Sequence, residues 1–148
     1  MTEGSGVRLA RLLIQTYEAM VEVVVDDLAR SGHPGLTAAN EFAMQAIDSG
    51  ASNAAALARA LGMSRQAAAK AIASLEALGY VSRTSDATDG RRKDLQLTES
   101  GRTAITTGGA AFDRLHTEWV RRVGSDRAAE VEAALGVMKD ALTTTSAR

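Results

Sequence analysis

The chain has 148 residues, a formal net charge of −1 and no cysteine, and its residues are 45% hydrophobic and 3% aromatic. This length suits one domain, or one small domain with extensions, and the composition is that of a globular protein. The missing cysteines exclude a disulfide framework, a thiolate zinc site and a cysteine nucleophile. The dense apolar run at 20–25 is too short and too charged to span a membrane, and no signal peptide is visible, so a cytoplasmic location is expected.

Positive charge is concentrated in the middle of the chain. Residues 59–93 hold seven cations and three anions, a balance of +4, whereas the remaining residues sum to −5. A basic middle between acidic ends favours contact between one surface and a polyanion. A chance fluctuation of charge along the chain explains the count about as well.

The N-terminal segment predicts a long helix from Arg8 to about Ser31. Its apolar residues recur at steps of three and four and form a stripe along one side. The stripe consists of Leu9, Leu12, Leu13, Tyr17, Met20, Val24 and Leu28. A second helix is expected from an N-cap at Thr37 to about Ser49. Its inward residues are expected to be Phe42, Met44 and Ile47.

Two helices in quick succession follow. The first is short and reaches Ala60, Gly62 allows a tight turn, and the second covers 65–78. The expected N-caps are Ser52 or Asn53 for the first helix and Ser64 for the second. The buried side of the second helix is expected to comprise Ala68, Ile72 and Leu75. This order is the helix-turn-helix pattern.

A β-hairpin is predicted directly after this pair. Residues 80–84 and 94–98 alternate as strands do, and the Asp-Gly pair at 89–90 between them is a strong turn signal. A helix-turn-helix followed by a hairpin is a winged helix. The hairpin is the wing, and its tip carries Arg91, Arg92 and Lys93.

The C-terminal third is predicted to be helical. The glycine pair at 108–109 is unfavourable inside a helix and indicates a close helix contact or a kink. Ser125 can cap a last helix after Gly124, whose inward residues would be Val131, Leu135, Met138 and Leu142. The two terminal stripes are too large to stay wet on a monomer. A two-fold dimer would bury them and set two copies of helix 65–78 ~34 Å apart, about one turn of a DNA duplex.

The outward face of helix 65–78 suits the major groove of DNA. Gln66 can hydrogen-bond to a base edge, Lys70 can reach a guanine or a phosphate, and the alanines let the helix approach closely. An ordinary alanine-rich surface helix has the same pattern. In the wing, Arg91 could enter the minor groove, steadied by an ion pair with Asp89; a solvated charged turn is the other interpretation.

Residues 52–83 and 86–101 resemble the DNA-binding core of the MarR family of bacterial transcription regulators. The matching elements are "LA" at 57–58, "LGMSR" at 61–65, "LEALGYVSR" at 75–83, Asp86, Asp89 and Arg91 in the wing, and "LT" at 97–98. Alanines at 67 and 69 depart from the hydroxyl residues usual in related recognition helices, and Ala87 replaces a frequent proline. The resemblance implies a homodimer of the flanking helices, and small aromatic acids that relieve DNA binding.

These observations lead to the following predictions. The fold is mainly α with a small β-hairpin, in which a winged helix-turn-helix core (35–100) lies between dimerisation helices at 1–34 and 101–148. The function is that of a homodimeric DNA-binding transcription regulator, expected to be a repressor, on a palindromic operator. The expected DNA-binding residues are Ser64, Arg65, Gln66, Ala69, Lys70, Ala73, Asp89, Arg91, Arg92 and Lys93. The expected lining of an effector cleft is Tyr17, Met20, Val24 and Met44, for which plain core packing is an equal alternative.

No enzymatic activity, cofactor or metal is expected, because the two histidines lie apart and no glycine-rich phosphate loop is present. The alternative function is a winged-helix module that binds proteins without specific DNA binding. The effector, the operator and the regulated genes stay open, as does the choice between repression and activation.

Overall fold

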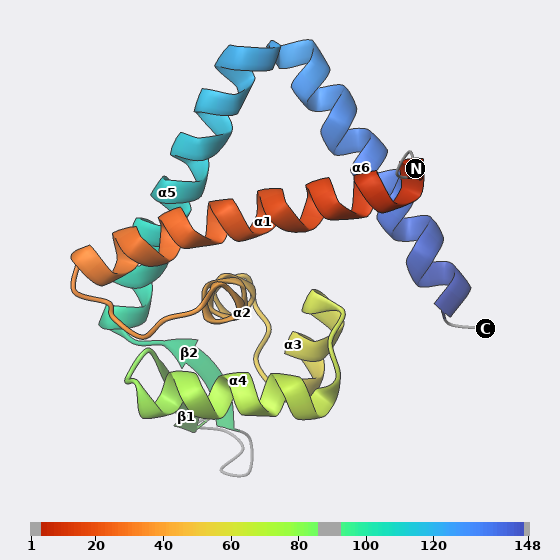
Figure 1. The fold of residues 1–148 in the computed structure, drawn as a ribbon. Coiled ribbons are helices and arrows are strands. Elements are labelled where there is room, and N and C mark those ends of the chain that lie inside the picture. Colours follow the sequence, from red (N-terminus) through yellow and green to blue (C-terminus); the bar gives the residue numbers. More distant parts are fainter. Residues whose placement is uncertain (1–3, 86–92, 147–148) are drawn as a thin grey trace. The chain divides into compact units, whose positions relative to one another are not determined.

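The structure is a computed structural model that describes residues 4–85 and 93–146. The helices are α1 (Ser5–Arg30), α2 (Ala38–Asp48), α3 (Ala54–Leu61), α4 (Arg65–Ala77), α5 (Glu99–Val123) and α6 (Ser125–Ser146). The strands are β1 (Val81–Ser85) and β2 (Lys93–Leu97), which pair antiparallel (Figure 1). The prediction of a mainly α fold with a small hairpin, in this order of elements, is therefore confirmed.

The chain divides into two compact units, residues 1–111 and 112–148, and α5 runs from the first unit into the second. The first unit contains α1 to α4, the hairpin and the first half of α5, and the second contains the rest of α5 and α6. The division into three functional segments at 1–34, 35–100 and 101–148 stays a prediction. No helix of the described residues is long and apolar enough to cross a membrane.

Short side chains start three helices of the first unit. The hydroxyl oxygen of Thr37 accepts a hydrogen bond from the backbone N–H of Asn40 (3.1 Å), whose amide oxygen accepts one from the N–H of Thr37 (3.0 Å). Asn53 caps α3 through the N–H of Ala56, and Ser64 caps α4 through the N–H of Ala67. These caps confirm the predicted starts, with Asn53 chosen over its neighbour, because each satisfies an N–H that has no acceptor within the helix.

The core of the first unit is built from aliphatic residues of every element. Its largest fully buried apolar side chains are Val24, Leu28, Met44, Leu57, Ile72 and Leu75. One expectation is wrong: Phe42 is 38% exposed. A helix advances by about 100° per residue, so Phe42 lies about 200° from Met44 and cannot share its buried side. Ala43 takes that place and is fully buried.

The hairpin packs one face on this core. Val81 pairs with Leu97 and Arg83 with Leu95, and the apolar members of these pairs are nearly inaccessible. The strands begin and end within one residue of the predicted positions. The tip at 86–92 lies outside the described residues, and so do Asp89, Arg91, Arg92 and the side chain of Lys93.

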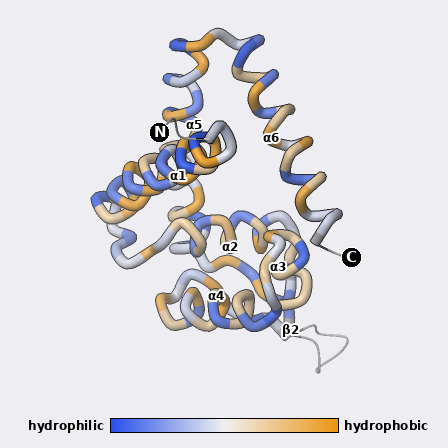
Figure 2. The backbone as a smooth tube through the Cα atoms, turned by 45° about the vertical axis from the view of Figure 1, so that its right-hand side comes forward, coloured by the Kyte–Doolittle hydropathy of each residue, from blue (hydrophilic) through white to orange (hydrophobic). Residues whose placement is uncertain are grey.

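The N-terminal half of α1 leaves its apolar residues exposed, whereas the C-terminal half buries them. Leu12 is 54% and Tyr17 48% exposed, but Val24 and Leu28 are inaccessible. Figure 2 shows apolar and polar residues alternating along this helix. Two of the seven residues of the predicted stripe, Val24 and Leu28, therefore belong to the core, whereas the four from Leu9 to Tyr17 are exposed on the single chain.

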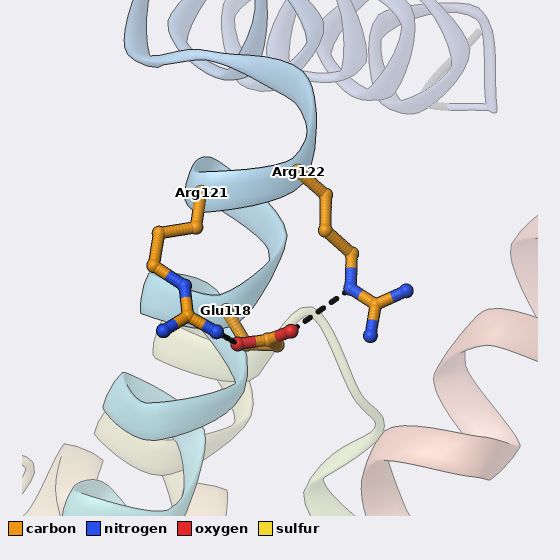
Figure 3. A network of polar contacts seen from close by, with 3 residues as sticks. All are labelled: Glu118, Arg121 and Arg122. Atoms are coloured by element: carbon orange, nitrogen blue, oxygen red, sulfur yellow. Dashed lines mark hydrogen bonds and ion pairs between the residues drawn. The ribbon is translucent and has the colours of Figure 1, made fainter.

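The second unit is a pair of helices joined at Gly124. Its helix α6 starts at Ser125 itself, so Gly124 and not Ser125 precedes the first turn. Near the end of α5 the carboxylate of Glu118 accepts from Arg121 and, at 2.9 Å, from Nε of Arg122 (Figure 3). The hydrogen bond from Arg122 is the main cause that lowers the pKa of Glu118. The predicted inward residues of α6 are all partly exposed, namely Val131, Leu135, Met138 and Leu142.

Candidate nucleic-acid interface

Helix α4 has a buried side and an open side. Ala68, Ile72 and Leu75 are at most 1% exposed and hold the helix against its neighbours, which include α2, α3 and β1. The predicted buried side is therefore confirmed. Of the residues expected to bind DNA, those at the start of α4 and along it are exposed: Ser64, Arg65, Gln66, Ala69, Lys70 and Ala73. Their role in DNA binding stays a prediction.

The turn before α4 fixes where this open side begins. Gly62 adopts the left-handed conformation (φ 64°), which a residue with a side chain adopts only at a cost. The N–H of Met63 bonds back to the carbonyl of Ala58 (3.0 Å), and Ser64 then caps α4. Arg65 and Gln66 are thus the first two residues of α4, directly after the turn of the helix-turn-helix.

An open hollow of about 630 Å³ lies beside this first turn. Its lining combines the start of α3, the start of α4 and the hairpin, through residues that include Asn53, Arg65, Gln66, Ala69 and Arg83. Asn53 and Arg83 were not predicted as site residues. From the sequence, Asn53 is expected to cap a helix and Arg83 to lie on a strand. Only the fold shows that both residues lie beside the first turn of α4.

Arg83 is held by a carboxylate of α4. Oε1 of Glu76 accepts from Nε of Arg83 at 3.0 Å and lies 2.9 Å from a terminal guanidinium nitrogen. Both side chains are partly exposed, so the pair adds at most about 1 kcal/mol to stability. The main effect of this ion pair is to orient Arg83, because it holds the guanidinium group of Arg83 in a fixed position relative to α4.

The other cations around the turn are not neutralised. Within the described part of the chain, Arg59, Arg65 and Lys70 form no ion pair with a carboxylate. Arg59 and Arg65 also line a second open hollow next to the first. Of the cations in this part of the sequence, Arg59, Arg65 and Arg83 therefore line two adjoining open hollows at the start of α4.

The expected effector-cleft residues differ in exposure. Val24 and Met44 are inaccessible, Met20 is half-buried and Tyr17 is 48% exposed. Two of the four thus belong to the core, as the packing alternative requires of them. Their binding of an effector stays a prediction.

Two buried polar groups were not singled out from the sequence. Glu41 is inaccessible, and burial raises the pKa of its carboxyl, which a hydrogen bond from Gln45 only partly opposes. Nδ1 of His33 lies 3.2 Å from the hydroxyl oxygen of Tyr80, and both residues are buried. An α-helical pattern gives no sign that a glutamate will be inside, since charged residues normally face water.

Comparison with known proteins agrees with this geometry. The model of the MarR family matches residues 43–92. No curated protein matches the chain by sequence. Among solved structures, the PcaV transcriptional regulator of Streptomyces coelicolor, in complex with its natural ligand, is similar with a TM-score of 0.75 and 20% identity, over 96% of this chain and 99% of that one.

Two further structures show the same fold. MepR of S. aureus, in complex with DNA, gives a TM-score of 0.75 at 19% identity over 94% of this chain and 99% of MepR. Wild-type MarR of E. coli in its apo form gives 0.63 at 20% identity over 93% of this chain and 98% of MarR. At these identities the similarity establishes the winged-helix fold.

Proposed function

We propose that this chain is a transcription regulator of the MarR family and that it acts as a homodimeric repressor on specific sites in double-stranded DNA. One observation carries the proposal. The exposed side of α4 combines a slim alanine surface with Gln66 and Lys70, and it lies beside Arg59 and Arg65, which no carboxylate of the described residues neutralises. The DNA complex of MepR supports the same partner for this chain.

Helix α4 fits the task of reading bases. The major groove is about 12 Å wide and admits one α-helix, provided that the side chains on the inserted face are small. Ala69 and Ala73 keep that face slim, while Gln66 and Lys70 supply polar groups one turn apart. Gln66 can form a bidentate contact with an adenine, and Lys70 can reach a guanine or a phosphate.

The wing, residues 85–93, completes the contact. In this proposal Arg91 enters the minor groove, Asp89 steadies it, and Arg92 and Lys93 lie near phosphates. Arginine suits this place because a narrow minor groove concentrates negative potential. Two protomers related by a two-fold axis would read two half-sites ~34 Å apart, which requires a palindromic operator.

The exposed apolar residues of α1 and α6 support the homodimer. Leu12, Tyr17, Leu135 and Leu142 leave large apolar surfaces in contact with water on the single chain. A small aromatic acid, bound near Tyr17, Met20, Val24 and Met44, is proposed as the effector. The PcaV structure with its natural ligand supports a small-molecule effector in general.

A salt titration on DNA tests the proposed function. Fluorescence anisotropy should show tight binding to the DNA upstream of the protein's own gene and weaker binding to scrambled DNA. Arg91→Ala removes two cations per dimer, so the slope of log affinity against log salt should flatten by about 1–2 units. Equal, weak affinity for both DNAs would instead favour the protein-binding module. Small aromatic acids should raise the melting temperature and release the DNA.

A further inference from the structure

The hollow beside α4 brings together three elements, and each contributes a hydrogen-bond donor. Arg65 lies in the first turn of α4, Arg83 lies on β1, and Asn53 is the N-cap of α3. The amide oxygen of Asn53 is occupied by the N–H of Ala56, which leaves the amide NH₂ to donate. These residues are far apart in the sequence, so the site exists only through the fold.

The donors in this hollow exceed the acceptors. A guanidinium has five N–H donors, and Arg83 directs only two of its nitrogens at Glu76. Arg65 forms no ion pair with a carboxylate within the described residues. Two planar guanidinium groups that line one hollow match the geometry of a tetrahedral oxyanion, which arginine can bind through two parallel hydrogen bonds.

We propose that Arg65 and Arg83, together with the amide of Asn53, hold one phosphate of the DNA backbone, and that Glu76 is a positioning residue for Arg83. This proposal rests on the proposed function. Gln66 and Ala69 line the same hollow, so the held phosphate would lie beside the base-reading face of α4. A phosphate contact there fixes the register of the helix on the duplex, while Gln66 supplies the sequence information.

The surroundings favour a polyanion over a free ion. The hollow is open, and the unpaired cations continue from it to Arg59 on one side and to Lys70 along α4. A row of cations on an exposed surface suits the regularly spaced charges of a duplex, which release counterions when they are bound. A free phosphate would occupy only the hollow itself and would leave Arg59 and Lys70 without an anion.

Four variants test the clamp on the full-length protein, with DNA from upstream of its own gene and with scrambled DNA. Arg65→Ala and Arg83→Ala should each weaken binding to both DNAs by a similar factor, and each should flatten the salt slope by about 1–2 units for the two protomers. The double variant should lose less than the product of the single losses, because both arginines hold one phosphate. Arg30→Ala removes an exposed cation at the end of α1 and should leave affinity and slope unchanged.

Glu76→Ala gives the sharpest test of positioning. If Glu76 only repels DNA, its removal should strengthen binding, because a negative charge disappears from the interface. If it positions Arg83, its removal should weaken binding several-fold, by roughly 3–10-fold, and should have no such effect when Arg83 is already alanine. Circular dichroism melts of every variant confirm that the fold is retained. Arg65→Lys and Arg83→Lys should keep the slope but lose affinity, since the charge stays and the planar fork is gone.

The outcomes separate this proposal from the proposed function. If the wild-type protein binds DNA but Arg65→Ala and Arg83→Ala keep its affinity and slope, the clamp is wrong and the DNA-binding function stands. If the wild-type protein binds no DNA even at low salt, both proposals fail. A thermal shift with inorganic phosphate at sub-millimolar concentration, lost in Arg65→Ala, would assign the hollow to a free anion and overturn the assignment to DNA.

Discussion

Glu41 and Gly108 are in direct contact, the carboxyl group of Glu41 on α2 occupying the space where a side chain at Gly108 of α5 would begin. A methyl group placed on Gly108 would lie only 2.7 Å from Oε2 of Glu41. Nε2 of Gln45 donates to Oε1 of Glu41 (3.1 Å) and lies 3.4 Å from the carbonyl oxygen of Ile105 on α5. The glycine pair in α5 therefore marks a close helix contact, which is one of the two predicted explanations.

Gly108→Ala should destabilise the protein, whereas Gly109→Ala should not. The new methyl group at 108 meets a carboxyl group that is fully buried and cannot turn into solvent, so the helices must shift, at a cost of roughly 1–3 kcal/mol. At 109 the nearest side-chain atom, Nε2 of Gln45, would be 3.6 Å away, and alanine should stabilise the helix by up to about 1 kcal/mol. Urea unfolding of both variants measures the difference. Equal effects at the two positions would contradict the close contact.

The buried carboxyl should make stability depend on pH. Burial raises the pKa of Glu41 in the folded state above its ordinary value, so folding favours the protonated form. Its contribution is then fully present below the unfolded pKa and is lost as pH rises through the folded pKa. The free energy of unfolding of the wild type, measured relative to that of Glu41→Gln, should therefore fall as pH rises above the ordinary pKa of a glutamate. Exposed Glu99→Gln is the control, and a difference that does not change with pH would contradict a raised pKa.

Tyr80→Phe should destabilise the first unit by roughly 1–3 kcal/mol, because it leaves Nδ1 of buried His33 without its partner. Nε2 of His33 already lacks a hydrogen-bond partner among the described residues. His33→Leu should be partly tolerated, and the double variant should lose less than the sum of the single losses. Thermal unfolding measures this coupling, and strict additivity would show that the contact does not contribute to stability. The contact joins the loop after α1 to the start of the hairpin.

Much of this fold could be predicted because its signals are local. Thr37, Asn53 and Ser64 each accept a hydrogen bond from an N–H group three residues further on. Gly62 is required by the positive φ angle of its own backbone. Such interactions are encoded by neighbours in the sequence. The buried side of α4 follows from its period in the same way.

The error at Phe42 was local, because its hydrophobicity placed it inside although the helical period sets it about 200° from Met44. The omissions arise where distant segments decide. Glu41 can be buried because Gly108 of α5 has no side chain and leaves room for its carboxyl group. Arg83 lines the hollow beside α4 because the hairpin brings it there, where Glu76 holds it. In each of these pairs the two residues lie on different elements, so no periodic pattern in the sequence could show that they are in contact.

Leu135→Asp should convert the proposed dimer into a monomer. Leu135 belongs to the apolar stripe of α6 and is 39% exposed on the single chain, and a dimer would bury it. A carboxylate buried there without a partner destabilises the interface strongly. Light scattering at micromolar concentration should give twice the 15.5 kDa chain mass for the wild type and close to a single chain mass for this variant. Val137→Asp is the control, because Val137 is 71% exposed and lies about 200° from Leu135 around α6. A wild type of single mass would contradict the dimer.

Gln66→Ala should reduce sequence discrimination without altering the electrostatic part of binding. Gln66 is neutral and exposed at the start of α4, where its amide can form paired hydrogen bonds with one base edge. Its loss should remove roughly 1–3 kcal/mol of discrimination at one base pair in each half-site, while the salt slope stays unchanged because no cation is removed. Lys70→Ala should instead flatten the slope if Lys70 reaches a phosphate, and lower discrimination if it reaches a guanine.

The exposed Gln96→Ala on β2 is the matched control and should leave both quantities unaltered. Anisotropy titrations on the operator and on its single-base variants measure discrimination, and the same titrations at several salt concentrations measure the slope. If Gln66→Ala keeps full discrimination at every position, α4 does not read bases through this residue, and the assignment of its open side to the major groove loses its main support.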